Sequence, residues 1–152
     1  MIVENADFKD IDQIVVIAKE ILPIYYDEDS TKTFLENNNI ILKAMVNNNI
    51  VGFLLAINEK NNIHIHSIGV DKQFRRIGVG KKLISYLQKY DYSTVTLNVS
   101  EANEGGIQFY KKIGFFNILF RENYYDSLDN NNAYLMCLTG KNISSCRKSG
   151  TI

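Results

Sequence analysis

Two kinds of apolar spacing alternate along this chain, and their order is the strongest constraint on its fold. Apolar residues recur at helical spacing in the stretches Phe8–Leu22, Gly78–Tyr90 and Asn103–Ile113. Ser30 is expected to begin a further short helix that ends near Leu35. Short apolar runs rich in β-branched residues indicate strands at Ile2–Glu4, Ile40–Val46, Ile50–Ile57, Ile63–Val70, Thr94–Val99, Phe115–Phe120 and Ala133–Leu138.

This order predicts an α/β fold. The elements follow one another as β-α-α-β-β-β-α-β-α-β-β, which implies a mixed, mostly antiparallel central sheet of about seven strands flanked by about four helices. Asp7 is expected to cap the first long helix and Pro23 to end it. Three asparagines, Asn47–Asn49, are expected to join two of the strands in a hairpin.

The size and composition of the chain suit one globular domain. Its 152 residues are 45% hydrophobic and 22% charged. We expect the domain to occupy residues 1–139, and a polar, flexible tail to occupy residues 140–152. The 17 basic and 17 acidic residues cancel, which argues against a protein whose main partner is a nucleic acid or an anionic membrane.

The cysteines favour neither a metal site nor an oxidising compartment. Cys137 and Cys146 form no C-x-x-C pair and have no histidine at metal-ligand spacing, so we expect no metal. Cys137 lies in an apolar run, where a buried free thiol is expected. No apolar stretch approaches the ~18 residues of a membrane span. We therefore expect a cytoplasmic protein.

The strongest chemical signal lies in Ile68–Lys81, where a strand runs through a glycine-containing loop directly into a helix. The first N–H groups of a helix are unpaired and lie at the positive end of its dipole, so Gly78 and Gly80 could let a diphosphate approach them closely. Arg75, Arg76 and Lys81 would add charge-assisted contacts. The equally weighted alternative is that the glycines only start a helix. The spacing fits neither the Walker A loop nor the G-x-G-x-x-G fingerprint, which disfavours nucleoside triphosphatases and dinucleotide enzymes.

Two motifs in this order resemble the acetyl-CoA-binding core of the GNAT superfamily of N-acetyltransferases. The loop from Arg75 to Gly80 matches the superfamily pattern Q/R-x-x-G-x-G, and Asn103–Phe115, with the sequence NEGGIQFYKKIGF, matches its second half. The predicted order of strands and helices is also that of the superfamily. The resemblance implies the GNAT fold, acetyl-CoA as the cosubstrate, and transfer of an acetyl group to a primary amine by direct attack.

The resemblance also implies roles for individual residues around acetyl-CoA. Backbone groups of Ile68 and Val70 would bind the pantetheine arm, and Asn103 would contact acetyl-CoA from the start of a helix. Tyr110 matches the tyrosine that protonates the departing thiolate, and the alternative is a core aromatic on an amphipathic helix. The pyrophosphate would be held by the loop residues Arg75, Arg76, Gly78, Val79, Gly80 and Lys81.

Two further motifs narrow the resemblance to the protein Nα-acetyltransferases of the NatE and RimI types. The proline loop Leu22–Tyr26, with the sequence LPIYY, and the N-Y-Y motif at Asn123–Tyr125 are similar to loops that form an apolar slot for a protein N-terminus in those enzymes. A helix stop and turn-flanking aromatics are the ordinary alternatives. By this resemblance the slot would comprise Leu22, Pro23, Ile24, Tyr26, Tyr124 and Tyr125.

The sequence departs from those enzymes at Asn98, where the RimI type carries a Glu and the NatE type a His, each implicated as the general base. A neutral amide does not usefully accept a proton, so the base must lie elsewhere. His64 and His66 are the only histidines, and residues two apart on a strand share a face. His64 aligns with a tyrosine that helps to position water in the NatE type, which makes it the first candidate base and His66 the second. Exposed strand histidines are the alternative.

The sequence thus predicts acetylation of a protein N-terminal α-amine, with acetyl-CoA and a polypeptide N-terminus as partners. An auxiliary subunit is compatible with this prediction. One alternative is a lysine or small-molecule amine acetyltransferase of the same fold, for which Asp27, Glu28 and Asp29 could line an acidic cleft. The other is a catalytically silent acyl-CoA-binding module, which Asn98 favours.

Overall fold

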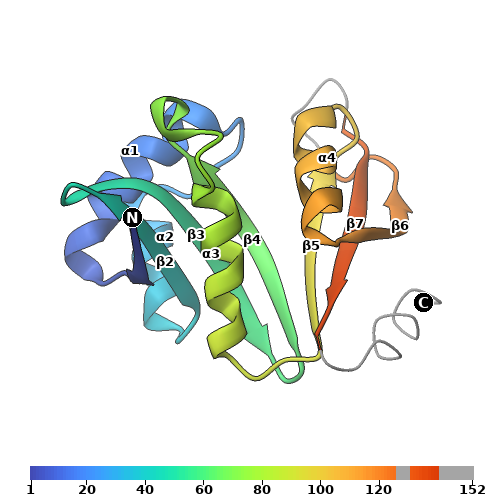
Figure 1. The fold of residues 1–152 in the computed structure, drawn as a ribbon, viewed down its shortest axis with the longest axis horizontal. Helices are drawn as coiled ribbons and strands as arrows, with labels where there is room; N and C mark the ends of the chain where they lie inside the picture. Colours follow the sequence, from blue (N-terminus) through green and yellow to red (C-terminus); the bar gives the residue numbers. More distant parts are fainter. Residues whose placement is uncertain (126–130, 141–152) are drawn as a thin grey trace. The chain divides into compact units, whose positions relative to one another are not determined.

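The computed structural model describes residues 1–125 and 131–140, so all of the predicted tail except Gly140 lies outside the described residues. The helices and strands follow in the predicted order (Figure 1). The strands are β1 (Ile2–Asn5), β2 (Ile40–Val46), β3 (Asn49–Glu59), β4 (Asn62–Val70), β5 (Thr94–Ser100), β6 (Phe116–Arg121) and β7 (Ala133–Thr139). The helices are α1 (Ile11–Ile21), α2 (Glu28–Glu36), α3 (Val79–Tyr86) and α4 (Glu104–Ile113), with 3-10 turns at Phe8–Asp10, Lys72–Phe74 and Leu87–Lys89.

The strands form a seven-stranded sheet in the order β1-β2-β3-β4-β5-β7-β6. β2 pairs antiparallel with β1 and β3, and β7 pairs antiparallel with β5 and β6. β4 and β5 run parallel, in a register that places Asn62 opposite Thr94 and Ile65 opposite Leu97. The prediction of an α/β fold with a mixed, mostly antiparallel sheet is therefore confirmed.

The chain forms two compact units, which are described separately. The first unit comprises Met1–Asn58 and His66–Tyr90, and the second comprises Glu59–Ile65 and the chain from Asp91 onward. β4 passes from the second unit into the first between Ile65 and His66. The predicted diphosphate loop and the proline loop belong to the first unit, whereas α4 and the N-Y-Y motif belong to the second.

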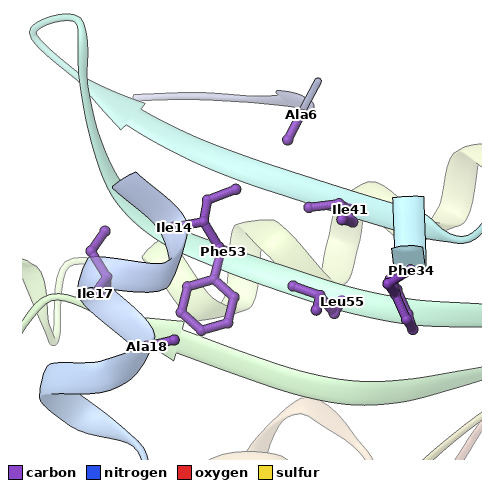
Figure 2. Close-up of a cluster of buried hydrophobic side chains, with 8 residues drawn as sticks. All are labelled: Ala6, Ile14, Ile17, Ala18, Phe34, Ile41, Phe53 and Leu55. Carbon is purple, nitrogen blue, oxygen red and sulfur yellow. The ribbon is translucent and has the colours of Figure 1, made fainter. Parts of the chain in front are cut away.

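In the first unit, α1 and α2 cover one face of the sheet. Their apolar side chains meet those of β2 and β3 in a buried cluster of Ala6, Ile14, Ile17, Ala18, Phe34, Ile41, Phe53 and Leu55 (Figure 2). Helix α3 covers the opposite face, since a Cβ on Gly52 would lie 2.9 Å from Val79 Cγ1 and 3.4 Å from Leu83 Cδ1. Gly52 and Phe53 are consecutive in β3 and so point to opposite faces. The apolar residues at the predicted helical and strand spacings thus form the contacts on both faces of the sheet in this unit.

Local side chains set the ends of these elements. Asp7 accepts a hydrogen bond from the Lys9 N–H at 3.1 Å and caps the 3-10 turn that leads into α1, as predicted. The prediction that Ser30 caps α2 is wrong. The helix begins at Glu28, because the Asp27 carboxylate accepts from the Ser30 N–H at 2.8 Å, and a carboxylate at this position caps as well as a hydroxyl.

Two asparagines with left-handed backbone conformations form the turn of the hairpin between β2 and β3. Asn47 and Asn48 have φ of 51° and 65°, the left-handed conformation that a tight two-residue hairpin turn requires and asparagine tolerates. The predicted hairpin is therefore confirmed, with β3 beginning at Asn49 rather than Ile50.

Cys137 on β7 is fully buried but disulfide-bonded, so the prediction of a free thiol is wrong. The number of cysteines in a sequence does not say whether the fold brings two of them within bonding distance. Within residues 1–125 and 131–140, no group of three or more His, Cys, Asp or Glu side chains could hold a metal ion. Over the same residues, no helix is long and apolar enough to cross a membrane.

Candidate active site

The predicted diphosphate loop joins β4 to α3 in the first unit. Arg76 and Gly78 have left-handed backbone conformations, with φ of 66° and 88°. A Cβ on Gly78 would meet no atom within 4 Å, so glycine serves here through its backbone freedom. Arg76 lacks that freedom, and its conformation costs about 1–2 kcal/mol. Backbone strain of this kind is typical of loops whose shape serves binding.

The first turn of α3 presents unpaired N–H groups. The Lys82 N–H donates to the Gly78 carbonyl at 3.0 Å, the first hydrogen bond of the helix. The N–H groups of Val79, Gly80 and Lys81 therefore have no acceptor within the helix. The side chain of Val79 is 2% exposed and anchors this turn in the core. The residues present thus fit a diphosphate, which would meet several N–H groups and the positive end of the helix dipole.

Arg75 has a contact that the sequence did not reveal. Its Nε donates to the Val70 carbonyl at 3.2 Å, and the next N–H along, that of Asp71, donates to the Val51 carbonyl at 2.8 Å. The backbone of Val70 was predicted to bind the pantetheine arm, and its carbonyl thus already accepts one hydrogen bond within the protein. Arg75 shapes the end of β4 in addition to carrying charge.

The regular pleat of β4 is interrupted before this loop. A Cβ on Gly69 would lie 2.6 Å from Ile21 Cδ1, which shows that Gly69 faces α1. His66 contacts Tyr26 and Phe34 on the same face of the sheet. Residues three apart on a regular strand face opposite sides, so the pleat is broken between His66 and Gly69, as at a β-bulge.

The proline loop Leu22–Tyr26 joins α1 to α2. Leu22 packs against the core cluster of the first unit, whereas Ile24 and Tyr26 are 48% and 37% exposed. The ring of Tyr26 stacks on His66 with centroids 4.3 Å apart. Burial lowers the pKa of His66, so its imidazole is mostly neutral at pH 7.

A cavity of about 410 Å³ opens beside this loop. It is lined by Tyr26, Asp29, Ser30, Thr33, Phe34, Asn37 and Asn39. Of the three acidic residues that could form an acidic cleft, Asp29 lines this cavity and Asp27 is used as the cap of α2. The cavity thus combines aromatic rings with hydrogen-bonding side chains and one carboxylate.

In the second unit, the N-E-G-G sequence forms the start of α4. Asn103 Oδ1 accepts from the Gly106 N–H at 2.9 Å and so caps the helix. A Cβ on Gly106 would lie 2.4 Å from Asn103 Nδ2, so any larger residue at position 106 would displace the Asn103 side chain from its capping position. Asn103 stands at the start of a helix, as predicted, and is exposed, but its side-chain oxygen already has a structural role.

Tyr110 lies on α4 among other aromatic rings. Its ring centroid is 5.2 Å from that of Phe109 and 5.6 Å from that of Phe115, both in edge arrangements. Burial, with a smaller contribution from Tyr125, raises the pKa of the Tyr110 hydroxyl well above its usual value. Tyr110 therefore keeps its proton at neutral pH.

The N-Y-Y motif lies against Asn98 on β5. Asn98 Nδ2 donates to the Tyr124 hydroxyl at 3.1 Å, and the rings of Tyr124 and Tyr125 meet edge to face at 4.9 Å. The guanidinium of Arg121 lies 5.5 Å from the Tyr124 ring, a cation–π contact that the sequence analysis missed. Asn98 Oδ1 is buried without a hydrogen-bond partner among the described residues.

His64 and His66 have different surroundings. His64 belongs to the second unit, where its Nδ1 lies 2.8 Å from Thr96 Oγ1, whereas His66 stacks on Tyr26 in the first. Thr96 was not singled out from the sequence. The signal was present, since polar residues occupy alternate positions of both strands, at Asn62 and His64 and at Thr94, Thr96 and Asn98.

The fold and these motifs are those of an acetyltransferase. Comparison with known proteins shows to which family the chain belongs. The model of the acetyltransferase (GNAT) family matches residues 9–115. The chain belongs to this family and is an acetyl-CoA-dependent N-acetyltransferase.

Named relatives and solved structures extend the similarity over most of the chain. An N-alpha-acetyltransferase from Sulfurisphaera tokodaii is 30% identical over 88% of this chain and 90% of its own. The crystal structure of Ard1 from Thermoplasma volcanium is 28% identical, with a TM-score of 0.80 over 93% of this chain and 98% of its own. Arabidopsis thaliana Naa50, in complex with the bisubstrate analogue CoA-Ac-MVNAL, shares the fold with a TM-score of 0.80 at 23% identity over 91% of this chain and 98% of its own.

Proposed function

We propose that this acetyltransferase acetylates the N-terminal α-amine of a polypeptide. The observation that carries the proposal is the hydrogen bond from Asn98 to Tyr124. It holds the N-Y-Y motif against β5 at the position where related enzymes carry their base, so an amine that reached this strand would have an aromatic wall beside it. The neutral amide and exposed tyrosine suit an uncharged peptide backbone better than a free cationic side chain.

The names of relatives support the same acceptor. N-alpha-acetyltransferases are named among proteins that are 30% and 26% identical over more than four-fifths of this chain. The structure of Naa50 contains an acetylated peptide that begins with Met. An apolar first residue is also what the apolar side chains of the proline loop, Leu22, Pro23, Ile24 and Tyr26, would accommodate.

The proposed reaction needs no covalent enzyme intermediate. The neutral amine attacks the thioester carbonyl, a C–N bond forms, the C–S bond breaks, and one proton leaves the nitrogen while one reaches the thiolate. Backbone N–H groups at the interrupted part of β4 would stabilise the oxyanion. Tyr110 would give its proton to the thiolate, and His64 would take the proton of the amine directly or through one water. In the first unit, the diphosphate of acetyl-CoA would bind the start of α3, and backbone groups of Ile68 would contribute further contacts.

The test is to locate the acetyl group. The purified chain, acetyl-CoA and two matched peptides are incubated, one with a free N-terminal Met and no lysine, the other blocked at its N-terminus with an internal lysine. Tandem mass spectrometry is expected to find the acetyl group on the α-amine of the first peptide and none on the second.

Two other results would point to the alternatives. Acetylation of the lysine peptide alone would overturn the proposal in favour of a side-chain acetyltransferase, for which Asp29 in the cavity wall is the supporting feature. Binding of acetyl-CoA by calorimetry without turnover of either peptide or of small amines would indicate a silent binding module.

A further inference from the structure

Asn132 lies where the ends of three neighbouring strands meet in the second unit. β7 lies between β5 and β6 in the sheet. Ser100, the last residue of β5, and Arg121, the last residue of β6, both pair with Ala133, the first residue of β7. Asn132 precedes Ala133, so it stands between the turns that follow the two outer strands. One of these turns leads into α4, and the other contains the N-Y-Y motif.

The side chain of Asn132 is hydrogen-bonded to both turns. Its Oδ1 accepts from the Asn123 N–H at 3.1 Å, and its Nδ2 donates to Glu101 Oε2 at 3.0 Å. The Glu101 N–H also donates to the Asn132 carbonyl at 2.9 Å. These partners distinguish the oxygen of the amide from its nitrogen, since a backbone N–H only donates and a carboxylate only accepts. Asn132 therefore joins Asn123 to Glu101.

The backbone of the N-Y-Y motif is thereby held on both sides of Tyr124. Asn123 has a φ of 53°, a left-handed conformation that asparagine tolerates and that its hydrogen bond to the amide stabilises. The Tyr125 N–H donates to the Asn131 carbonyl at 2.9 Å. Tyr124 lies between these two anchored residues, and its hydroxyl accepts from Asn98 Nδ2 at 3.1 Å. The anchors fix the backbone that the single side-chain bond to Asn98 leaves free to move.

We infer that Asn132, held by Glu101, is a positioning residue that fixes the N-Y-Y motif beside β5. This inference rests on the proposed function, in which the motif forms an aromatic wall beside the acceptor amine. Asn132 acts by setting the place of Tyr124. Loss of its bond to Glu101 should therefore weaken the binding of the acceptor peptide and leave the binding of acetyl-CoA unchanged, because the predicted diphosphate loop belongs to the first unit.

The test exchanges donor and acceptor between Asn132 and Glu101. Asn132→Asp keeps an acceptor for the Asn123 N–H but sets a second carboxylate against Glu101, so the bond between the two side chains is lost and their charges repel. In the double variant with Glu101→Gln, the new amide can donate to the new carboxylate, and the net charge is that of the parent. Rescue isolates this bond from every other contact of Asn132, because Glu101→Gln can compensate only for the bond that the two side chains share.

Steady-state kinetics with the Met peptide measure the effect. Asn132→Asp should raise the KM for the peptide about 10-fold, a loss typical of a hydrogen bond to a charged group, with kcat little changed. The double variant should recover most of this loss. Asn117→Asp, at an exposed position of β6 in the same unit, adds the same charge and should leave the KM unchanged. The dissociation constant of acetyl-CoA, measured by calorimetry, should be the same in every variant.

Amide exchange supplies a readout that needs no turnover. In the ¹⁵N-labelled full chain, we expect the Asn123 N–H to be protected and to lose this protection in Asn132→Ala, which removes its acceptor. A general loss of stability would also speed exchange in the paired strands, so the N–H of Leu97 on β5 serves as the internal reference.

Two results would overturn the inference. One is a double variant whose peptide KM is as high as that of Asn132→Asp, and the other is an Asn123 N–H whose exchange is unchanged in Asn132→Ala. If Asn132→Asp alone does not fold, recovery of the fold in the double variant is the supporting result and its absence the refuting one. A chain that proves inactive on α-amine peptides would refute the proposed function, while the exchange of the Asn123 N–H would still decide whether Asn132 holds the motif.

Discussion

Replacement of Asp10 by Asn is expected to destabilise the protein by about 2–3 kcal/mol at pH 7. Lys43 Nζ lies 2.9 Å from Asp10 Oδ2, and the two side chains are only 8% and 10% exposed. Asp10 stands immediately before α1 and Lys43 lies on β2, so the pair ties the helix that leads into the proline loop to the sheet. Asn at position 10 would leave a covered ammonium without its nearest carboxylate.

The expected loss of stability follows from the contacts that Lys43 and residue 10 keep in the Asp10→Asn variant. Removing one partner of a buried ion pair typically costs about 3–5 kcal/mol. Here Glu4 stays 3.5 Å from Lys43, although at 51% exposed it compensates only partly. In the parent protein the Asp7 N–H donates to Asp10 Oδ2 at 3.0 Å, and the side-chain oxygen of an Asn at position 10 can accept the same hydrogen bond. These two remaining contacts place the expected loss below the usual range.

The effect should depend on pH in one direction. Burial alone would raise the pKa of Asp10, but hydrogen bonds from the Asp7 N–H and Lys43 outweigh it and hold the pKa below its ordinary value of 3.8. A depressed carboxyl pKa gives stability that is present above the unfolded value and is lost as the pH falls through the folded one. The hydrogen bond to Asp10 also raises the pKa of Lys43 above 10.5, so Lys43 loses its contribution only at still higher pH. The difference between parent and variant should thus be full at pH 7 and shrink toward pH 2–3.

Urea denaturation of both proteins at pH 7 and pH 3 measures this difference, with unchanged slopes showing that the unfolded states are comparable. Lys43→Met, which keeps the apolar stem, is the matched control, and the double variant should recover part of the loss because no unpaired charge remains. A change below about 0.5 kcal/mol at pH 7, or a loss that is the same at both pH values, would refute the argument.

Four further predictions concern the site. Arg76→Gly removes the charge of the side chain but keeps a residue that accepts the left-handed backbone, so it should raise the acetyl-CoA dissociation constant at least ~10-fold by calorimetry. Lys72→Ala, which lies outside the stretch Arg75–Lys81, should leave the dissociation constant unchanged. Gly78→Val should weaken the binding of acetyl-CoA by a similar factor, because a β-branched side chain strains the backbone at the φ of 88° that Gly78 adopts. An affinity equal to that of the parent protein would disprove the predicted diphosphate site. His64→Ala should lower kcat by about 10²-fold or more with acetyl-CoA affinity retained, and Tyr110→Phe should do likewise with the larger deficit at alkaline pH. Full activity of His64→Ala from pH 6 to 9 would leave bulk water as the proton acceptor.

Most of the fold could be predicted because its signals are local. Apolar spacing placed every helix and strand within a few residues, and Asn47 and Asn48 marked a turn that their backbone angles confirm. The errors arose where two local signals competed or where a partner was distant. Asp27 and Ser30 can both cap a helix, and the one that does is set by where the backbone enters α2. The disulfide of Cys137 depends on contacts that no spacing encodes.

The site was predictable in its parts more than in its connections. The diphosphate loop, Asn103 and the two aromatic motifs were recognisable because each is a continuous stretch. The bonds from Asn98 to Tyr124 and from Thr96 to His64 join residues 26 and 32 positions apart and follow from strand register. Alternating polar residues on two strands are visible in a sequence, but their pairing requires knowing that β4 and β5 are parallel neighbours.

The strength of the base also bears on the acceptor. On the proposed mechanism the proton acceptor is an imidazole with an unperturbed pKa near ~6.5, while Asn98 supplies no charge. At pH 7 roughly a tenth of an α-amine with a pKa near ~8 is already neutral, but only about one part in 2,500 of a lysine amine with a pKa near ~10.4. Burial or a second positive charge near the lysine would be needed to lower its pKa and close that ~250-fold gap, and the neutral Asn98 supplies no positive charge. A site built from Asn98, Tyr124 and His64 is therefore better matched to an α-amine than to a lysine side chain.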